Sequence, residues 1–180
     1  MWKSGMKLKN IKVVTECGML LAVAMALSWF KLYQLPSGGS VSLATLPLFI
    51  IAARHGAVTG VVCGMLMGLL SLIRQPFIVH PLQFVLDYPL AYGAMGLAGI
   101  IKWTGGIRVA VAVSLSYLVR LHFHVITGAL FFITDAENMT AALIGSYIYN
   151  LSFLVPETLI CVGFGVFIAM KHKSLIDQNE

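Results

Sequence analysis

The sequence predicts an all-α membrane protein, a single integral membrane domain over residues 1–180 that forms a bundle of six transmembrane helices. Composition is the first reason: 59% of the 180 residues are hydrophobic, the mean hydropathy is +0.90, and there are only 12 basic and 7 acidic residues. Soluble domains are about 45–50% apolar, so a soluble globular protein is excluded. Length is the second reason, because six spans of about 20 residues use about 120 residues and leave about 60 for connections.

Charged residues and Gly/Pro clusters divide the chain into six apolar stretches. We expect them at about 11–33, 41–53, 56–73, 80–101, 107–132 and 141–170. The first stretch follows four lysines, as a secretory signal peptide does, but it is long and has no A-x-A cleavage site before polar sequence. We therefore expect a retained first span.

The second stretch is too short for a comfortable crossing of the bilayer, and it carries Pro47. We expect it to cross with a tilt or to end before the far side. The irregular loop Pro36-Ser37-Gly38-Gly39-Ser40 would then fold over it and is the first candidate for a lid. The sequence has no internal repeat, so a transporter built from two matching halves is not indicated.

Small residues recur every four positions along two of the stretches, a pattern that lets helices approach closely. They are Gly60, Gly64 and Gly68 in the third stretch, and Gly18, Ala22 and Ala26 in the first. We expect the face in the third stretch to pack inside the bundle. For the first stretch, the pattern alone leaves packing inside the bundle and contact with another protein equally open.

The distribution of Lys and Arg predicts cytoplasmic termini. Six spans place both ends on one side, and cytoplasmic segments carry the excess of basic residues. With the ends inside, the outer segments hold only Lys31 and Arg74, whereas the inner segments hold Lys3, Lys7, Lys9, Lys12, Arg54, Lys102, Arg108, Lys171 and Lys173. These residues lie at junctions between apolar runs and form no stripe or tail, so the net charge of +5 does not indicate nucleic-acid binding.

Ionisable residues inside the apolar stretches are the main candidates for a ligand site, since each costs roughly 2.5–3.5 kcal/mol at the membrane centre. The fourth stretch carries His80 and Asp87, whose seven-residue spacing places them on one helix face. The fifth carries Arg120 and His124 one turn apart, and the sixth carries Asn150, followed by Pro156 and Glu157. If Asp87, His124 and Asn150 converge near the outer leaflet, they form an anionic acceptor, an imidazole and an amide.

Aromatic residues near these positions are candidates for the walls of such a site, namely Tyr88, Phe132, Tyr147 and Tyr149. A carboxylate among aromatic faces suits a small, flat, nitrogen-rich and cationic ligand, because a desolvated cation gains from both. The alternative is that Asp87 and Arg120 neutralise one another as a buried structural pair. Both interpretations can hold together, with Arg120 tuning the carboxylate.

Other kinds of site are not indicated. Cys17, Cys63 and Cys161 are widely spaced inside apolar runs and form no C-x-x-C, so we expect small core residues and neither disulfides nor a zinc site. His122 and His124 point about 200° apart on a helix, so one metal ion cannot bind both. The chain has no G-x-x-x-x-G-K-[ST] motif, so the energy for uphill transport must come from another chain or an ion gradient.

Four segments, in order over most of the chain, carry a resemblance to a known family. They are Pro36-Ser37-Gly38-Gly39-Ser40-Val41-Ser42, His80-Pro81-Leu82-Gln83-Phe84-Val85-Leu86-Asp87-Tyr88, Arg120 through His124 to Gly128-Ala129-Leu130-Phe131-Phe132, and Tyr149-Asn150 with Val155-Pro156. With these segments the sequence resembles the thiamine-specific S components of energy-coupling factor (ECF) transporters.

The resemblance implies a six-helix, multi-pass protein of the bacterial plasma membrane that captures extracellular thiamine. It implies docking on a shared module made of a membrane coupling protein and two ATPase subunits. In the family's toppling model, the bundle rotates in the membrane to release the vitamin inward. No enzymatic activity and no cofactor of its own are implied, since the partner subunits hydrolyse the ATP.

The resemblance also implies residue roles. The substrate-binding positions fall at Asp87, Tyr88, His124, Gly128, Phe132 and Asn150, and the docking motif of the first helix falls at Gly18 and Ala22. We add Tyr147 to the substrate set, because relatives carry a tyrosine where this chain has Gly145 and Tyr147 lies nearby. Some relatives also have Trp at the position of Phe132, Tyr at Phe77, or Glu at Asp87.

Three other functions remain open at this stage. An S component for a related pyrimidine or another vitamin would keep the same fold. An intramembrane enzyme would use His80, Asp87 and His124 as an acid–base or metal site. A self-contained secondary transporter would move its substrate without ATPase partners.

Overall fold

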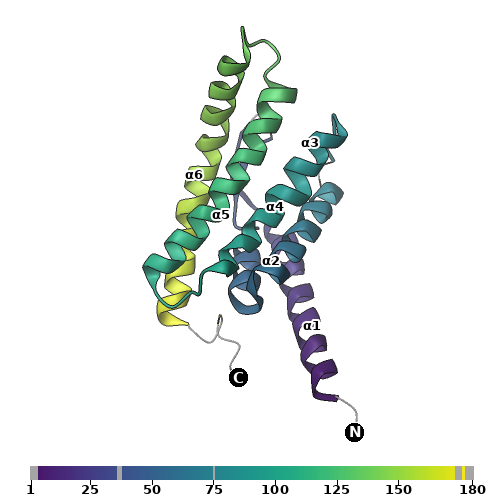
Figure 1. Cartoon of the computed structure of the whole chain (residues 1–180), viewed down its shortest axis with the longest axis vertical. Helices are drawn as coiled ribbons and strands as arrows, with labels where there is room; N and C mark the ends of the chain where they lie inside the picture. Colours follow the sequence, from purple (N-terminus) through teal and green to yellow (C-terminus); the bar gives the residue numbers. More distant parts are fainter. Residues whose placement is uncertain (1–3, 36–37, 75, 173–175, 177–180) are drawn as a thin grey trace.

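The chain folds almost entirely into helices (Figure 1). The computed structural model describes residues 4–35, 38–74, 76–172 and 176. In chain order the elements are α1 (Ser4–Leu27), β1 (Lys31–Gln34), β2 (Ser40–Ser42), α2 (Leu46–Arg74), α3 (Pro81–Val85), η1 (Leu86–Leu90), α4 (Ala91–Gly93), η2 (Ala94–Ile100), α5 (Gly106–Thr127), η3 (Gly128–Phe132) and α6 (Met139–Lys171). The predicted helical class is therefore confirmed.

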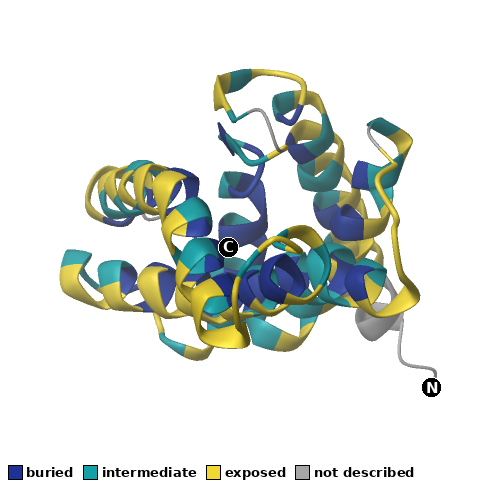
Figure 2. Cartoon of the chain, turned by 90° about the horizontal axis from the view of Figure 1, so that it is seen from above, coloured by how far each residue is buried: buried dark blue, intermediate teal, exposed yellow. Residues whose placement is uncertain are grey.

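Three helical stretches in the described part of the chain are long and apolar enough to cross a membrane by length and composition. They are Leu46–Arg74, Gly106–Phe132 and Met139–Lys171. Many large apolar side chains on them are exposed, among them Val58, Ile107 and Leu159, while the buried residues face inward (Figure 2). An apolar exterior of this extent is expected for a surface that faces lipid, so the chain is a membrane protein.

The first predicted span, 11–33, extends too far at its end. Helix α1 includes Ser4 at its start and ends at Leu27, and Lys31–Gln34 forms strand β1 instead of a last helical turn. Strand β1 pairs antiparallel with β2, so a hairpin occupies the region of the predicted lid loop. Short apolar runs do not distinguish strand from helix by pattern, which is why the hairpin was missed. Pro36 and Ser37 of that loop, like Lys3 and Lys173 of the basic count, lie outside the described residues.

One face of α1 packs on α2. Cys17, Ala24 and Ser28, at heptad-like spacing, are buried on that face. Glu16 adds an ion pair to Arg54, and its other oxygen lies 3.2 Å from Nε2 of His55. These contacts attach α1 to the bundle along one narrow side, so the rest of its surface is open.

Helix α2 consists of two arms that fold back on each other at Gly56. Gly56 has φ 82° and ψ 171°, in a region that favours glycine. A Cβ on Gly60 would lie 2.8 Å from Cβ of Ala52, although residues eight apart in a straight helix are about 12 Å apart. The arm before Gly56, residues 46–55, spans only about 15 Å. It is therefore too short to cross an apolar layer of about 30 Å, as expected for the stretch with Pro47, but its helix begins at Leu46 and not at residue 41.

The second arm of α2 packs on the segment 81–100 through glycine. A Cβ on Gly64 would lie 2.3 Å from the Tyr92 carbonyl oxygen, and one on Gly68 would lie 2.3 Å from that of Tyr88. Gly60 likewise meets the backbone of Gly96. The small residues of the third stretch therefore pack inside the bundle, as predicted.

Two π-helical turns interrupt the helices of the fourth and fifth stretches. In η1, Pro89 has no N–H to donate, and the Ala91 N–H reaches back five residues to the Leu86 carbonyl. In η3, the Ile133 N–H donates to the Gly128 carbonyl at 3.0 Å. Such wider turns are frequent at functional sites, and both fall on segments predicted to bind ligand.

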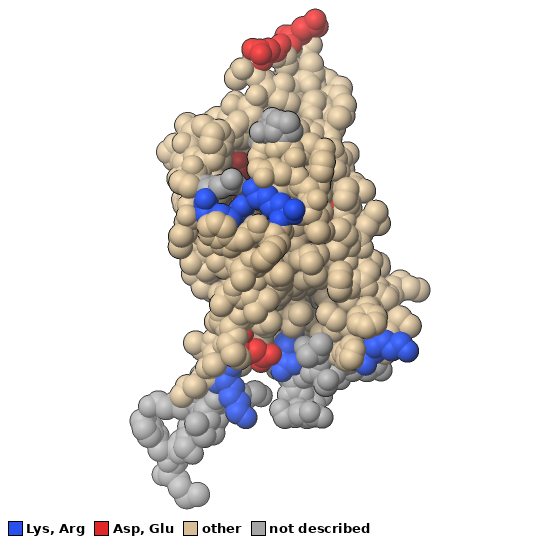
Figure 3. Space-filling view, turned by 180° about the vertical axis from the view of Figure 1, so that it is seen from behind, with Lys and Arg blue, Asp and Glu red and all other residues tan. Residues whose placement is uncertain are grey.

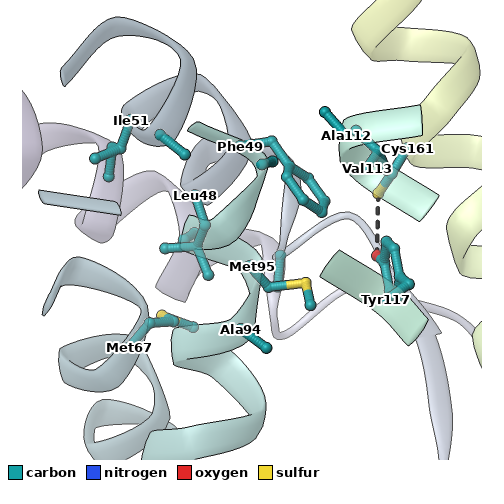
Figure 4. Close-up of a cluster of buried hydrophobic side chains, with 14 of the residues drawn as sticks. Leu48, Phe49, Ile51, Met67, Ala94, Met95, Ala112, Val113, Tyr117 and Cys161 are labelled. Atoms are coloured by element: carbon teal, nitrogen blue, oxygen red, sulfur yellow. Dashed lines mark hydrogen bonds between the residues drawn. The ribbon is translucent and has the colours of Figure 1, made fainter. Parts of the chain in front are cut away.

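The core lies where both arms of α2, the segment 81–100, α5 and α6 meet. Figure 4 shows Leu48 and Phe49 of α2 packed near Met95 of η2, with Tyr117 of α5 beside them. The Tyr117 hydroxyl and the Cys161 thiol on α6 share a hydrogen bond of 3.3 Å. All three cysteines are buried and free, as expected for core residues.

Candidate ligand site

The site is centred on the carboxylate of Asp87, which the π-helical turn η1 places against α5. Its Oδ1 lies 2.8 Å from Nδ1 of His124 and accepts a hydrogen bond of 2.6 Å from the Thr127 hydroxyl. Its Oδ2 accepts a hydrogen bond of 2.9 Å from the Gln83 amide. The Asp87 side chain is 15% exposed, so the structure brings the predicted carboxylate and imidazole into direct contact in a largely buried place.

Two of these donors, Gln83 and Thr127, were not predicted from the sequence. Gln83 precedes Asp87 by four residues and Thr127 follows His124 by three, so each lies on the same helix face as a predicted residue. That spacing was the available signal. Neutral polar residues in an apolar run are less costly than charged ones, and they were passed over for that reason.

The suggested pairing of Asp87 with Arg120 is wrong. The Arg120 guanidinium pairs with Glu157 on α6, with Nη1 3.6 Å from Oε2, and its Nε donates a 3.3 Å hydrogen bond to Nε2 of His124. The carbon at the centre of the guanidinium lies 4.9 Å from the centre of the Tyr92 ring. His124 therefore stands between Arg120 and Asp87, and the buried counter-ion of Arg120 is a residue that the sequence analysis gave no role.

Asn150 joins the site from α6. Its side-chain amide donates to the Ser146 carbonyl at 2.9 Å and lies 3.5 Å from the His124 carbonyl, and the residue is 5% exposed. A Cβ on Gly128 would lie only 2.1 Å from Oγ of Ser146. The backbone of η3 therefore packs closely on the Ser146 side chain at Gly128, and the amide of Asn150 lies beside His124.

Tyr88 and Phe132 meet at a third residue, Phe77. The Tyr88 hydroxyl donates to the Phe77 carbonyl at 3.0 Å, and the Phe77 N–H lies 3.2 Å from the same hydroxyl. The rings of Phe77 and Phe132 stack with their centres 5.8 Å apart, and Phe132 is 43% exposed. These contacts tie the connection between α2 and α3 to both predicted aromatic residues.

Tyr147 and His80 lie away from the carboxylate. The Tyr147 ring meets the ring of His122 edge-on at 6.3 Å, on the face of α5 that points away from His124. His80 caps α3 by accepting the Leu82 N–H at 3.1 Å and stacks on Phe131 at 4.9 Å. Among the described residues, no group of three or more His, Cys, Asp or Glu side chains could hold a metal ion.

The β-hairpin reaches the site through α6. The Gly39 N–H donates a 2.8 Å hydrogen bond to the Tyr149 hydroxyl, and Gly39 packs directly against the Phe153 ring. Phe153 in turn meets the His124 ring at 6.4 Å between centres. A loop near the start of the chain thus contacts a residue that touches the site, which fits the position expected of a lid.

Two open cavities lie elsewhere on the protein. One, of about 200 Å³, is formed by the turn at residues 104–108, and one of about 140 Å³ lies between α5 and α6 around Tyr117 and Leu151. Neither is lined by Asp87, His124 or Asn150. The candidate ligand site at Asp87 is therefore separate from both cavities.

The predicted docking face of α1 is open. Gly18, Ala22 and Ala26 are exposed, and a Cβ on Gly18 would meet no atom within 4 Å. These residues lie on the side of α1 that does not pack on α2. Within the part of the chain that the structure describes, Gly18 is therefore not closely packed, in contrast to the glycines of the third stretch.

Comparison with known proteins places these features in a family. The family model described as "Thiamine transporter protein (Thia_YuaJ)" matches residues 14–177. The thiamine transporter ThiT of Bacillus subtilis (strain 168) is 34% identical over 172 residues, covering 88% of each chain. ThiT of Lacticaseibacillus paracasei is 24% identical over 191 residues, covering 92% of this chain and 95% of the relative.

A solved structure, that of ThiT from Listeria monocytogenes, has the same fold. The TM-score is 0.82 at 24% sequence identity, over 94% of this chain and 99% of the other.

Proposed function

The chain belongs to the thiamine transporter protein family, and from that premise we propose that it is the substrate-binding membrane subunit that captures extracellular thiamine for uptake. The observation that carries the proposal for the site is the buried Asp87 carboxylate with its three donors. Thiamine joins a cationic thiazolium ring to an aminopyrimidine ring. Transport is not an enzymatic function, so the chain is not an enzyme.

In the proposed site, Asp87 pairs with the cationic part of thiamine. A buried carboxylate gives a large gain to a desolvated cation, because little water competes for it. His124 and Asn150 hydrogen-bond or stack on the polar edge of the ligand, and Tyr88 and Phe132 wall the rings. Gly128 lets the backbone come close. We assign Tyr147 no direct contact, since its ring meets His122.

We propose a single membrane domain of six spans with both ends in the cytoplasm of a bacterial cell. The turn at Gly56, which separates two arms of α2, supports counting them as separate segments. Helix α1 begins and α6 ends at the same end of the bundle (Figure 1). In Figure 3 several basic side chains lie near that end with an acidic one among them, another basic group lies in the upper half, and acidic side chains form the opposite tip. The basic side chains near the chain ends agree with the excess of Lys and Arg on the cytoplasmic side.

We propose that partner subunits supply the energy, as in ECF transporters. The sequence contains no nucleotide-binding P-loop, and the site needs no cofactor for binding. The exposed face of α1 around Gly18 and Ala22 is the proposed surface for the membrane coupling protein. Two ATPase subunits would complete the transporter.

A binding titration tests the function. The full-length protein, purified in detergent, is titrated with thiamine while its tryptophan and tyrosine fluorescence is followed. We expect saturable binding at one site that pyrimidine fragments displace weakly and riboflavin does not displace. Binding of a pyrimidine fragment in preference to thiamine would instead assign the protein to a related substrate.

A transport assay separates the coupled subunit from a self-contained transporter. Vesicles that contain only this chain are expected to bind thiamine without accumulating it. Accumulation driven by an imposed ion gradient, with no ATPase present, would contradict the coupled mechanism.

A further inference from the structure

Arg120, His124 and Asp87 form a chain of hydrogen bonds whose direction is fixed by chemistry. An arginine guanidinium has donors only, so the 3.3 Å contact from Nε of Arg120 requires Nε2 of His124 to be the acceptor. Nε2 then carries no proton. The other ring nitrogen, Nδ1, must carry the proton that binds Oδ1 of Asp87 at 2.8 Å.

We infer that Arg120 is a positioning residue for the ligand site: it holds His124 in the neutral tautomer protonated at Nδ1, so that the charge of Asp87 stays available to a cationic ligand. The inference rests on the proposed function, because it concerns how a cation is bound there. Arg120 itself does not need to touch the ligand.

The charges of the site explain why a neutral His124 matters. Arg120 and Glu157 cancel each other as an ion pair, which leaves Asp87 as the one net negative charge among the groups that contact His124 and Arg120. A protonated His124 would neutralise Asp87 before any ligand arrives, and a bound cation would then leave a net positive charge in a buried site. Unpaired buried charge is costly, so protonation of His124 opposes cation binding.

Arg120 is well held for this role. It is 7% exposed, and Glu157 is 1% exposed. Glu157 also accepts a 3.2 Å hydrogen bond from the hydroxyl of Thr45, the residue before α2, and the guanidinium lies over the Tyr92 ring on α4. Groups from α6 and α4 therefore fix its direction, and with it the aim of Nε at His124.

Two charged side chains contact the His124 ring, and its remaining neighbours are uncharged. From η1 it meets Asp87, and on α5 it meets Arg120. From α6 it meets the Phe153 ring edge-on, and its backbone carbonyl lies near the Asn150 amide. Asp87 and Arg120 are thus the charged partners of the ring, with Glu157 acting through Arg120.

Nuclear magnetic resonance tests the tautomer directly. The full-length protein is labelled with ¹⁵N-histidine and the ring signals of His124 are assigned by their loss in His124→Gln. We expect Nδ1 to be protonated and Nε2 to be unprotonated at pH 8. A proton on Nε2 at pH 8 would overturn the inference, even if thiamine binds tightly.

The pH profile of thiamine binding tests the consequence. The double variant Arg120→Met with Glu157→Gln removes both charges together, which avoids a lone buried charge. Without Arg120, Nε2 of His124 no longer has to accept a hydrogen bond, and the ring, which still lies beside Asp87, is free to take a second proton. We therefore expect the affinity of the double variant to fall about tenfold relative to wild type between pH 8 and pH 5.5. The ratio to wild type at each pH cancels any titration of thiamine itself.

Two further variants complete the test. Arg108→Met, which removes an exposed arginine from the same helix, is expected to keep the wild-type profile. Arg120→Lys keeps a side chain that only donates hydrogen bonds. We expect its thiamine affinity to depend on pH almost as that of the wild type does. A double variant whose affinity ratio to wild type is constant with pH would overturn the inference, whereas no binding by wild type at pH 8 would contradict the proposed function instead.

Discussion

Asp87 shows how one charged residue can be tolerated in an apolar segment. Its two oxygens receive hydrogen bonds from Gln83 and Thr127 and a contact from His124, and none of these partners carries a full opposite charge once His124 is neutral. The carboxylate is oriented but not neutralised. A residue in that state has most to gain from a cationic ligand.

Removal of the Asp87 charge should therefore weaken binding strongly. Asp87→Asn keeps the shape of the side chain but removes the charge, and loss of one partner of a desolvated charge pair costs about 2–5 kcal/mol. We expect a loss of thiamine affinity of that size in the fluorescence titration. Asp135→Asn, at an exposed position between η3 and α6, is the control and should bind as wild type does. Affinity within twofold of wild type for Asp87→Asn would remove this residue from the site.

At this scale the sequence predicted the charged members of the site better than their partners. Asp87 and His124 stood out because an ionisable residue in a span must be explained. Glu157 also met that criterion, but no role was predicted for it. Arg120 was predicted to pair with Asp87, whereas its partner is Glu157. The distance between two helices cannot be read from one sequence, so which carboxylate faces which cation had to come from the structure.

At the scale of elements, α2 packs closely on the segment 81–100. Glycines on both sides bring the backbones into contact without intervening side chains. Close approach of this kind supplies van der Waals contact between helices where lipid offers no hydrophobic driving force. The contact also supports η1, which carries Asp87.

A methyl group in this contact should destabilise the fold. In Gly96→Ala the new Cβ would lie 2.0 Å from the Val61 backbone nitrogen, which cannot move aside as a side chain does. Overpacking typically costs 1–3 kcal/mol, so we expect a lower melting temperature in detergent. Gly163→Ala is the matched control, because its Cβ would meet no atom within 4 Å and alanine favours a helix by up to about 1 kcal/mol. An unchanged melting temperature for Gly96→Ala would contradict this contact.

The hydrogen bond between the hairpin and α6 should slow release of the ligand. Tyr149→Phe removes the acceptor of the Gly39 N–H, and a hydrogen bond of this kind is worth about 0.5–1.5 kcal/mol. We expect thiamine to dissociate about two- to tenfold faster in stopped-flow displacement. Tyr147→Phe, on the face toward His122, should dissociate as wild type does. Equal rates for wild type and Tyr149→Phe would exclude a role for this contact in holding the loop.

The predicted apolar stretches overlap helices of the structure, and the errors at their ends have physical causes. Trp29, Phe30 and Leu32 are apolar and were counted into the first span, yet Trp29 and Phe30 follow the end of α1 and Leu32 lies in strand β1. The π-helical turns depend on Pro89 and on tertiary contacts at Gly128. No period in the sequence marks such turns, whereas the glycine at position 56 gave a visible boundary.

At the scale of the whole molecule, α1 differs from the other helices. It packs on α2 along one side only, and its exposed small residues make an open strip on the outside of the bundle. The ligand site involves residues of α3, η1, α5, η3 and α6, and none of the described side chains of α1. Binding and docking can therefore be separated by mutation.

Bulky substitutions on α1 should abolish transport and leave binding intact. In Gly18→Trp the new side chain points into open space in this chain but would block close approach of another helix. We expect wild-type thiamine affinity and loss of uptake in cells that contain the coupling module. Gly163→Trp adds the same bulk to an open position on α6 and should retain uptake. Normal uptake by Gly18→Trp would exclude this strip as the docking face.

The overall class was the part of the molecule most accessible from sequence. Composition and length required a helical membrane bundle, and the structure and the family agree. Which helices pack side by side could not be predicted from the sequence, because the surface of every apolar stretch can contact either lipid or another helix. This packing determines which of the polar residues meet.

The pairing of Arg120 with Glu157 also constrains how the protein is made. Glu157 follows Arg120 by 37 residues, so α5 leaves the ribosome carrying an arginine whose counter-ion has not yet been synthesised. An arginine at the centre of a lone helix costs about 2.5–3.5 kcal/mol on insertion scales. Helix α5 is therefore expected to settle in the bilayer together with α6, and the newly made chain gains its ligand site only when its last helix has entered.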